Sequence, residues 1–232
     1  MFSIHHLFYV LSAVLTFVVV LRFANTLRNS RHERTVKRAV FVLLIVFEVF
    51  YHIHNWSYPR FSIPLHICGF AVVMSLFMLK SDSQKLFDFL FFFGILGGIM
   101  ALVFPNSWGY TYRNIRYYHF LILHNILIAI PLYYYKAYGY RVTYRTLWNV
   151  YKTVLVLAIF VHLLNLSFQH FGYDSNYWFI TYVPAVVEDY FPSYPLYIVT
   201  YLGLVLLVMH VLFYATHKDA WPIKNKKNHS SE

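Results

Sequence analysis

Long apolar stretches dominate the chain, and they decide what it can fold into. A helix that crosses a bilayer needs roughly 20 mostly apolar residues. Stretches such as "AVFVLLIVFEVF" are apolar on every face and lack the alternation of barrel strands. Seven windows fit a spanning helix, at 4–24, 39–53, 64–79, 86–104, 118–135, 147–168 and 195–214. With 59% hydrophobic and 12% charged residues, the chain is predicted to be an all-α polytopic membrane helix bundle of about seven transmembrane helices.

The Lys and Arg residues divide unevenly between the two sides of this predicted bundle. If the N-terminus is outside, only Arg60, Arg113 and Arg116 of the 19 basic residues fall on the outer side, and the other sixteen fall inside. Because basic residues near helix ends stay on the cytoplasmic side, the split predicts an N-out, C-in orientation. Topology and attraction to the inner leaflet then explain the formal net charge of +10. No basic patch remains for nucleic-acid binding.

The two ends of the chain add no further folded domain to this prediction. The first window has no basic residue before it and no small-residue cleavage site after it, so we expect it to be retained. Residues 1–217 are therefore predicted to form a single seven-helix membrane domain. Residues 218–232, which include "KNKKNHSSE", are predicted to be a disordered basic cytoplasmic tail.

Polar side chains gather in the outer half of four predicted spans. In lipid such side chains are costly and usually line an interior cavity, so their depth carries information. The inner half has little comparable beyond Asp88 and His210. The outer-half residues are Glu48 and His52, His66 and Cys68, His119 and His124, and His162 with Asn165. This sorting predicts a polar pocket that opens toward the outer leaflet.

Helix geometry limits which of these side chains can act together. His66 and Cys68 are separated by about 200° around a regular helix, and His119 and His124 by about 140°. Only one member of each pair is therefore expected to face the pocket squarely. A lone buried histidine such as His162 is often only a hydrogen-bonded packing residue. From spacing alone, either His119 or His124 can be the partner of Cys68.

Three chemistries fit the polar pocket. In the first, a histidine takes the proton of the Cys68 thiol and the thiolate attacks an acyl carbonyl. In the second, transport or sensing uses Glu48, paired with His52 one helical turn away, and the histidines as a proton relay. The third is a zinc site, but the spacings match no compact zinc motif, so we expect neither a metal nor another cofactor. That zinc site would use His66, Cys68, His119 and His124.

Four ordered sequence blocks resemble a known family. They are "IPLHIC", "GILGGIMALVFP", "RYYHFLILHNILIAIPLYY" and "NLSFQHFGYDSNYWFI", and together they resemble the YwaF-like family of bacterial membrane proteins from about residue 48 to 214. That family looks related to a eukaryotic transmembrane acyltransferase that remodels ether phospholipids through a cysteine acyl-enzyme and a partner histidine. The resemblance implies that Cys68 is the nucleophile and His124 its partner. His66 and Asn125 match surrounding motif positions with no assigned role.

The residues and the resemblance together predict a function at the outer leaflet. We expect a membrane-embedded acyltransferase of the bacterial plasma membrane that acts on a phospholipid or other acylated lipid through a Cys-His acyl-enzyme. The alternative is a non-enzymatic transporter or permease-like protein with a polar outer cavity, which would not need the cysteine.

Supporting roles follow from the same prediction. Arg113 and Arg116 lie just before the fifth window, where a guanidinium can bind lipid phosphate or simply extend to the interface. Asn125, Asn165 or the backbone near Pro64 could donate hydrogen bonds to an oxyanion. The sequence does not rank these donors.

Overall fold

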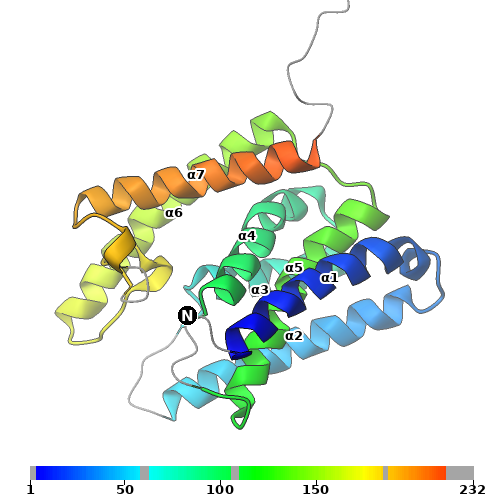
Figure 1. The fold of residues 1–232 in the computed structure, drawn as a ribbon, viewed down its shortest axis with the longest axis horizontal. Helices are drawn as coiled ribbons and strands as arrows, with labels where there is room; N and C mark the ends of the chain where they lie inside the picture. Colours follow the sequence, from blue (N-terminus) through cyan, green and yellow to red (C-terminus); the bar gives the residue numbers. More distant parts are fainter. Residues whose placement is uncertain (1–3, 58–62, 106–109, 185–187, 218–232) are drawn as a thin grey trace, which may run out of the picture.

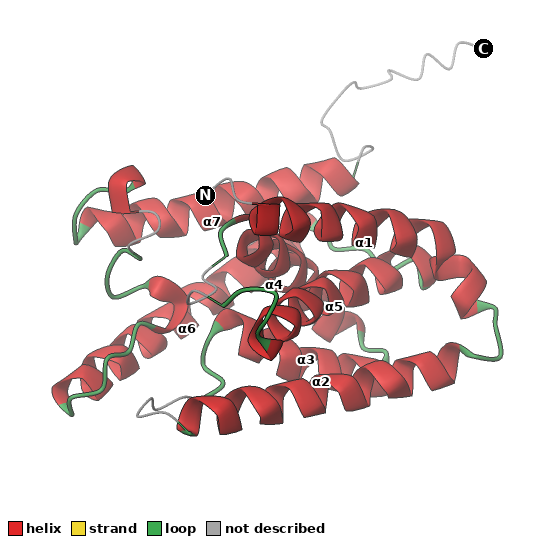
Figure 2. Cartoon of the chain, turned by 60° about the horizontal axis from the view of Figure 1, so that its bottom comes forward, coloured by secondary structure: helices red, strands yellow, loops and turns green. Residues whose placement is uncertain are grey.

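Seven α-helices make up most of the described chain in the computed structural model, which describes residues 4–57, 63–105, 110–184 and 188–217 (Figures 1 and 2). No strand occurs in these ranges, so the predicted all-α fold is confirmed. Arg60 and the predicted tail 218–232 lie outside them. The helices are α1 Ile4–Arg28, α2 Glu33–Trp56, α3 Ile67–Ser81, α4 Gln84–Val103, α5 Ile115–Ala137, α6 Tyr144–His170 and α7 Leu196–Thr216, with the short 3₁₀ helices η1 Tyr177–Phe179 and η2 Glu188–Tyr190 before α7.

Five of these helices are long and apolar enough to cross a membrane: α1, α4, α5, α6 and α7. α3 has 15 residues, which gives a length of about 22 Å against a hydrocarbon core of about 30 Å. α2 has 24 residues, but it begins with the charged stretch "ERTVKR", six residues before the predicted window at 39–53. The protein is therefore a multi-pass membrane protein, and a full crossing by α2 and α3 stays a prediction.

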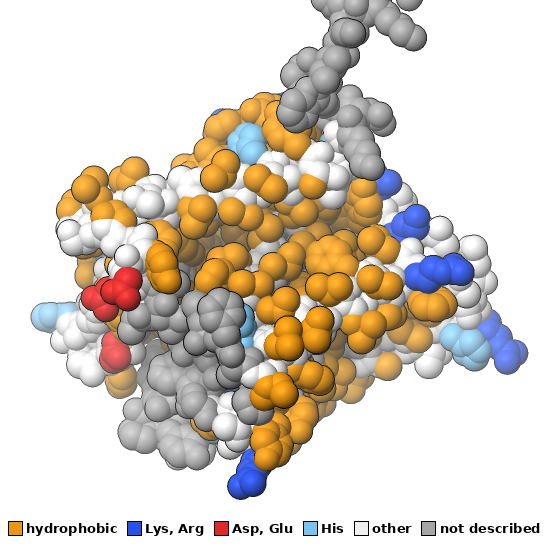
Figure 3. Space-filling view, in the orientation of Figure 1, with side chains coloured by type: hydrophobic (Ala, Val, Ile, Leu, Met, Phe, Trp, Pro, Cys, Tyr) orange, Lys and Arg blue, Asp and Glu red, His pale blue; other side chains and the backbone are white. Residues whose placement is uncertain are grey.

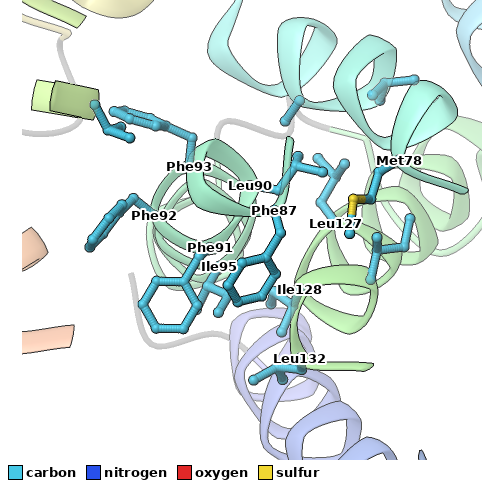
Figure 4. Close-up of a cluster of buried hydrophobic side chains, with 14 of the residues drawn as sticks. Met78, Phe87, Leu90, Phe91, Phe92, Phe93, Ile95, Leu127, Ile128 and Leu132 are labelled. Carbon is cyan, nitrogen blue, oxygen red and sulfur yellow. The ribbon is translucent and has the colours of Figure 1, made fainter. Parts of the chain in front are cut away.

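The core lies where α4 and α5 pack together. Thirteen residues of α5 are buried, more than in any other described helix. Phe87 and Leu90 of α4 are fully buried and lie close to Met78 of α3 and Ile128 of α5 (Figure 4). In a bilayer the lipid tails are as apolar as these side chains, so close van der Waals packing stabilises the helix contact. The side chains carried by α4 and α5 therefore project from two closely packed helices.

Two glycines let α4 approach α5 unusually closely. A Cβ atom on Gly94 would lie 2.8 Å from the Leu127 carbonyl oxygen. A Cβ on Gly98 would lie 2.6 Å from Cγ1 of Ile128 and 2.9 Å from the carbonyl oxygen of His124. Small residues four apart commonly line such close membrane-helix contacts. The position of His124 is thus fixed by a backbone contact with α4.

α6 and α7 pair with each other and flank the α1–α5 bundle (Figure 1). Large apolar side chains on their outer faces are exposed, including Val156 and Ile159 of α6 and Val199 and Val211 of α7. Figure 3 shows apolar side chains spread over this face of the molecule. In water such a surface would be unfavourable, whereas lipid tails solvate it. These exposed faces fit a bilayer.

A polar cluster joins the connections between α1 and α2, α3 and α4, and α5 and α6. The Lys37 ammonium pairs with Asp82, and the Tyr140 hydroxyl donates to the Asp82 carbonyl oxygen. The Tyr138 hydroxyl donates to Glu33 at 2.8 Å. Three connections therefore meet at one end of the bundle, as the predicted up-and-down path requires. Lys and Arg side chains gather toward one end of the face in Figure 3, and we call the end with this cluster the basic end.

Candidate active site

Cys68 and His124 meet in the half of the bundle away from the basic end. The Nε2 atom of His124 on α5 lies 3.3 Å from Sγ of Cys68 on α3. Cys68 is partly exposed, while His124 is only 5% exposed. The histidine that the spacing left undecided is therefore His124, and His119 points elsewhere.

The proton position on His124 follows from its second contact. Its Nδ1 atom lies 2.7 Å from the Phe120 carbonyl oxygen, one turn earlier on α5. A carbonyl oxygen can only accept, so Nδ1 must donate. In the neutral ring, Nε2 then has a free lone pair directed at the thiol. His124 is thus oriented as an acceptor for the thiol proton.

The start of α3 presents Cys68 at a helix N-terminus. α3 begins at Ile67 after an extended His66, so Pro64, the first residue of the predicted window 64–79, lies before the helix. Gly69 permits a close approach of the preceding segment, because a Cβ there would lie 3.2 Å from the Pro64 Cα. The first amide with a backbone acceptor is that of Phe70, which donates to the His66 carbonyl oxygen. The earlier amides of the first turn have no such acceptor within the described ranges, as is usual at a helix N-terminus.

His119 belongs to a second polar group beside the Cys68–His124 pair. Its Nε2 lies 3.1 Å from the Phe47 carbonyl oxygen, which must accept. Its Nδ1 can then accept from the Arg116 guanidinium, whose Nη1 lies 3.3 Å away. Tyr51 stacks on the His119 ring at 5.9 Å between centroids. α2 and α5 together hold the orientation of this second group.

Glu48 and His52 form the pair expected from their spacing on α2. Nε2 of His52 lies 3.0 Å from Oε1 of Glu48. His52 is 8% exposed, so the pair lies largely out of solvent.

His66 and Asn125 contact other parts of the structure. The His66 ring packs 4.8 Å from Tyr177 in the segment after α6. His66 is extended and precedes α3, so the angular separation expected on a regular helix does not apply to it. The Asn125 amide nitrogen donates to Ser12 of α1 at 2.9 Å, and its oxygen accepts from Thr16 at 2.7 Å. In this structure Asn125 therefore ties α5 to α1.

Asn165 and His162 hold the loop that follows α6. The Asn165 side chain exchanges two hydrogen bonds of 2.9 Å with the backbone of Tyr177, and His162 contacts the Thr181 hydroxyl at 3.3 Å. Trp178 donates its indole N–H to the Leu65 carbonyl oxygen at 2.7 Å. The loop is thereby tied to the segment just before Cys68.

Two residues near the site were not identified from the sequence. Gly98 lies against the His124 backbone, and Trp178 donates a hydrogen bond to the segment before α3. The Gly94–Gly98 spacing indicated close helix packing. No sequence pattern, however, predicts which backbone atoms a residue such as Gly98 or Trp178 contacts. Among the described residues, no three His, Cys, Asp or Glu side chains form a group that could hold a metal ion.

The fold and the site define a multi-pass helical membrane protein whose cysteine and a buried histidine meet within hydrogen-bond distance at one end of the bundle. The chain belongs to the TMEM164 family, with a match over residues 1–214. That match includes residues 1–47, which the resembling sequence blocks did not cover, and it does not show the YwaF-like bacterial name. No curated protein and no solved structure matches the chain.

Proposed function

We propose that this protein is an acyltransferase that transfers an acyl chain from a membrane lipid through a thioester on Cys68. The observation that supports it most directly is the 3.3 Å contact between Nε2 of His124 and Sγ of Cys68. The second ring nitrogen donates to the Phe120 carbonyl oxygen, so Nε2 is free to accept a proton. A cysteine activated by an oriented histidine is a common device for acyl transfer.

The first half of the reaction forms the acyl-enzyme. His124 takes the proton from Sγ, and the thiolate attacks the ester carbonyl carbon of the lipid, forming a C–S bond. The tetrahedral intermediate collapses as the ester C–O bond breaks. His124 returns its proton to the leaving oxygen, and the lysolipid departs. No electron is gained or lost.

The second half transfers the acyl chain to an acceptor. The acceptor is a hydroxyl or amine, such as that of a lysophospholipid, and its proton passes to His124 as it attacks the thioester carbonyl. The C–S bond then breaks and the proton returns to the sulfur. If water were the acceptor, the same steps would make the protein a lipase.

Backbone amides at the start of α3 are suitable donors to the tetrahedral oxyanion. The amides of Ile67 and Gly69 flank Cys68 and precede the first backbone acceptor bond, made by Phe70. Donors fixed in place before the reaction stabilise developing charge without reorganisation. The amides of Asn125 and Asn165 are already occupied by Ser12 and by the Tyr177 backbone, so we assign this role to the α3 backbone.

The membrane setting is part of the same proposal. The sixteen-to-three division of basic residues supports an orientation in which the basic end faces the cytoplasm. We therefore propose that the Cys68 end lies in the outer leaflet of the bacterial plasma membrane, and that the acyl donor is a phospholipid or other acylated lipid of that leaflet.

The proposal is tested by trapping the acyl-enzyme. Purified protein is incubated with a phospholipid carrying a labelled acyl chain, quenched and analysed by mass spectrometry. We expect an adduct on Cys68 that hydroxylamine removes, because hydroxylamine cleaves thioesters. His124→Ala should reduce the rate of adduct formation by about 10²–10⁴-fold, since the general base is lost.

His210→Ala is the matched control for loss of a histidine. His210 lies on α7, where it contacts the Leu206 carbonyl oxygen, and the variant should form the adduct at the wild-type rate. A label that persists in Cys68→Ala would reject the mechanism. Under the transporter alternative, Cys68→Ser would keep full function and no adduct would form in any variant.

A further inference from the structure

Arg116 is a buried cation without an acidic partner. The residue is 9% exposed, at the second position of α5. The described ion pairs are Arg28–Glu33, Lys37–Asp82 and His52–Glu48, and none of them includes Arg116. Its Nε atom is buried and has no hydrogen-bond partner among the described residues. Burying a charge is costly unless it is paired, so an unpaired guanidinium in this position calls for an anion.

The surroundings of Arg116 orient its guanidinium. Nη1 lies 3.3 Å from Nδ1 of His119, and that histidine is held in turn by the Phe47 carbonyl oxygen. The guanidinium carbon lies 4.5 Å from the centre of the Tyr51 ring. It also lies 6.0 Å from the centre of the Tyr110 ring. One nitrogen is thus bound by a histidine, while Nε keeps an unused N–H.

A phosphate matches the groups that remain. The Nε–H of an arginine and an adjoining terminal N–H lie on one edge of a planar fork, which binds two oxygens of a phosphate together. The hydroxyls of Tyr51 and Tyr110 can turn to donate to the same anion. The N-terminus of α5 adds a favourable field for negative charge. The phosphodiester of a phospholipid presents two non-bridging oxygens to the fork, and each of them can accept a further hydrogen bond from a hydroxyl.

The position of Arg116 relative to His124 agrees with the shape of a phospholipid. The two residues are eight positions apart on α5, about 12 Å along the helix axis. Arg116 lies nearer the helix end and hence nearer the membrane surface. In a phospholipid the phosphate lies at the surface and the acyl ester lies a few bonds deeper. A phosphate at Arg116 would therefore leave the ester on the side of His124 and Cys68.

We propose that Arg116, supported by His119, Tyr51 and Tyr110, is the phosphate-binding subsite for the lipid whose ester reaches Cys68. The choice of lipid rests on the proposed function, whereas phosphate binding itself does not. Arg113 was the other candidate from the sequence. It is exposed and its guanidinium lies 5.8 Å from the ring of its neighbour Tyr112, so it is not part of this subsite.

The test compares two lipids that differ in phosphate. Binding of dioleoylphosphatidylcholine and of dioleoylglycerol, which lacks phosphate, is measured on the purified full chain. Wild type should bind the phospholipid more tightly. Arg116→Gln should weaken phospholipid binding by about tenfold or more, because charge-assisted bonds are lost, and should change dioleoylglycerol binding by less than about twofold. Arg116→Lys, which keeps the charge but not the fork, should fall between wild type and Arg116→Gln.

The other possible results of the binding experiment either overturn the phosphate subsite or identify its ligand. Equal affinity of wild type for the two lipids would overturn the subsite, even if every Arg116 variant failed to fold. The subsite would also be overturned if Arg116→Gln weakened the binding of both lipids equally. It would likewise be overturned if Arg113→Gln weakened phospholipid binding as much as Arg116→Gln does. If inorganic phosphate displaces the phospholipid and stabilises wild type without lipid, soluble phosphate is the ligand; no displacement identifies the headgroup.

The acyltransferase proposal and the phosphate-subsite proposal can be rejected independently of each other. The labelled dioleoylglycerol ester can acylate Cys68 without using Arg116. If wild type forms no adduct from either lipid but still prefers the phospholipid through Arg116, the acyltransferase proposal is wrong and the phosphate subsite stands. If the adduct forms from both lipids and Arg116→Gln changes neither affinity, the subsite is wrong and the acyltransferase proposal stands.

Discussion

At the scale of single residues, the hydrogen bonds of His124 and His119 determine which ring nitrogen donates and which accepts. The Phe120 carbonyl oxygen accepts a hydrogen bond from Nδ1–H of His124, so only Nε2 can accept from Cys68. The Phe47 carbonyl oxygen accepts a hydrogen bond from Nε2–H of His119, so only Nδ1 can accept from Arg116. Two histidines on one helix thus have opposite tautomers. Because backbone carbonyl oxygens fix both, neither assignment changes with neighbouring side chains.

Glu33 is the titrating residue whose effect on stability can be predicted. It opens α2, before the apolar window. Burial alone would raise its pKa, but hydrogen bonds from Tyr138, Tyr133 and Arg28 outweigh burial and hold the pKa below its usual range. A folded-state pKa below the unfolded value means that the contribution to stability is present above the unfolded pKa of about 4.3 and is lost as pH falls through the folded value.

We therefore expect the stability gap between wild type and Glu33→Gln to depend on pH. In detergent, wild type should have the higher unfolding midpoint at pH 6 to 7, at an ionic strength of about 0.1 M. The gap should shrink as the pH falls below about 4, because protonated Glu33 then resembles glutamine. Thermal unfolding followed by circular dichroism measures the gap. A gap that widens in acid would show that Glu33 is not held as a carboxylate.

At the scale of helices, the contact between α4 and α5 sets where His124 lies. Gly98 of α4 meets both the His124 carbonyl oxygen and the Ile128 side chain. Any side chain at that position must push the two helices apart. The Cys68 thiol comes from α3 and would not follow α5. The reactive pair is thus sensitive to a residue that touches neither reacting atom.

Gly98→Ala should lower both stability and acylation. A Cβ at 2.6 Å from Ile128 and 2.9 Å from the His124 oxygen cannot be accommodated without a shift, and such overpacking costs about 1–3 kcal/mol. The thermal midpoint and the rate of adduct formation on Cys68 should fall together. Gly203→Ala on α7, where nothing lies within 4 Å of the added carbon, should leave both unchanged. An unchanged acylation rate in Gly98→Ala would show that the α4 contact does not position His124.

The helices also show how far sequence reasoning reaches. The apolar windows located all seven helices, because burial in lipid or core requires a continuous apolar face. They missed the first six residues of α2, because four of the six are charged and the segment extends beyond the apolar region at the basic end. The resemblance predicted the pairing of Cys68 with His124, which the structure brings together, whereas spacing alone left His119 and His124 open. The partners of His119 were not, because a carbonyl oxygen such as that of Phe47 has no sequence signature.

At the scale of the whole molecule, the structure has two polar ends of different kinds. The basic end is held by Lys37, Asp82, Glu33 and their tyrosine partners. The opposite end holds Cys68 and the histidines. The arrangement of the helices does not determine which end faces the cytoplasm. That assignment depends on the division of Lys and Arg residues between the two ends.

We predict that the basic end faces the cytoplasm. A tag on the N-terminus should be reached by an impermeant reagent in intact cells, and a tag on the C-terminus should be reached only after permeabilisation. Sixteen basic residues on one side against three on the other underlie this expectation. Labelling of the C-terminal tag in intact cells would place Cys68 in the cytoplasmic leaflet and reverse the predicted side of the reaction.

The chain has one cysteine, and that cysteine is partly exposed within the site. A thiol-specific electrophile with a lipid-like tail can therefore attach at one position only, with no background from other thiols. The moles of reagent consumed per mole of protein give a direct count of competent molecules in any preparation, before a substrate is known. The same reagent, carrying a spin label, would report the distance from this site to any second label placed on the bundle.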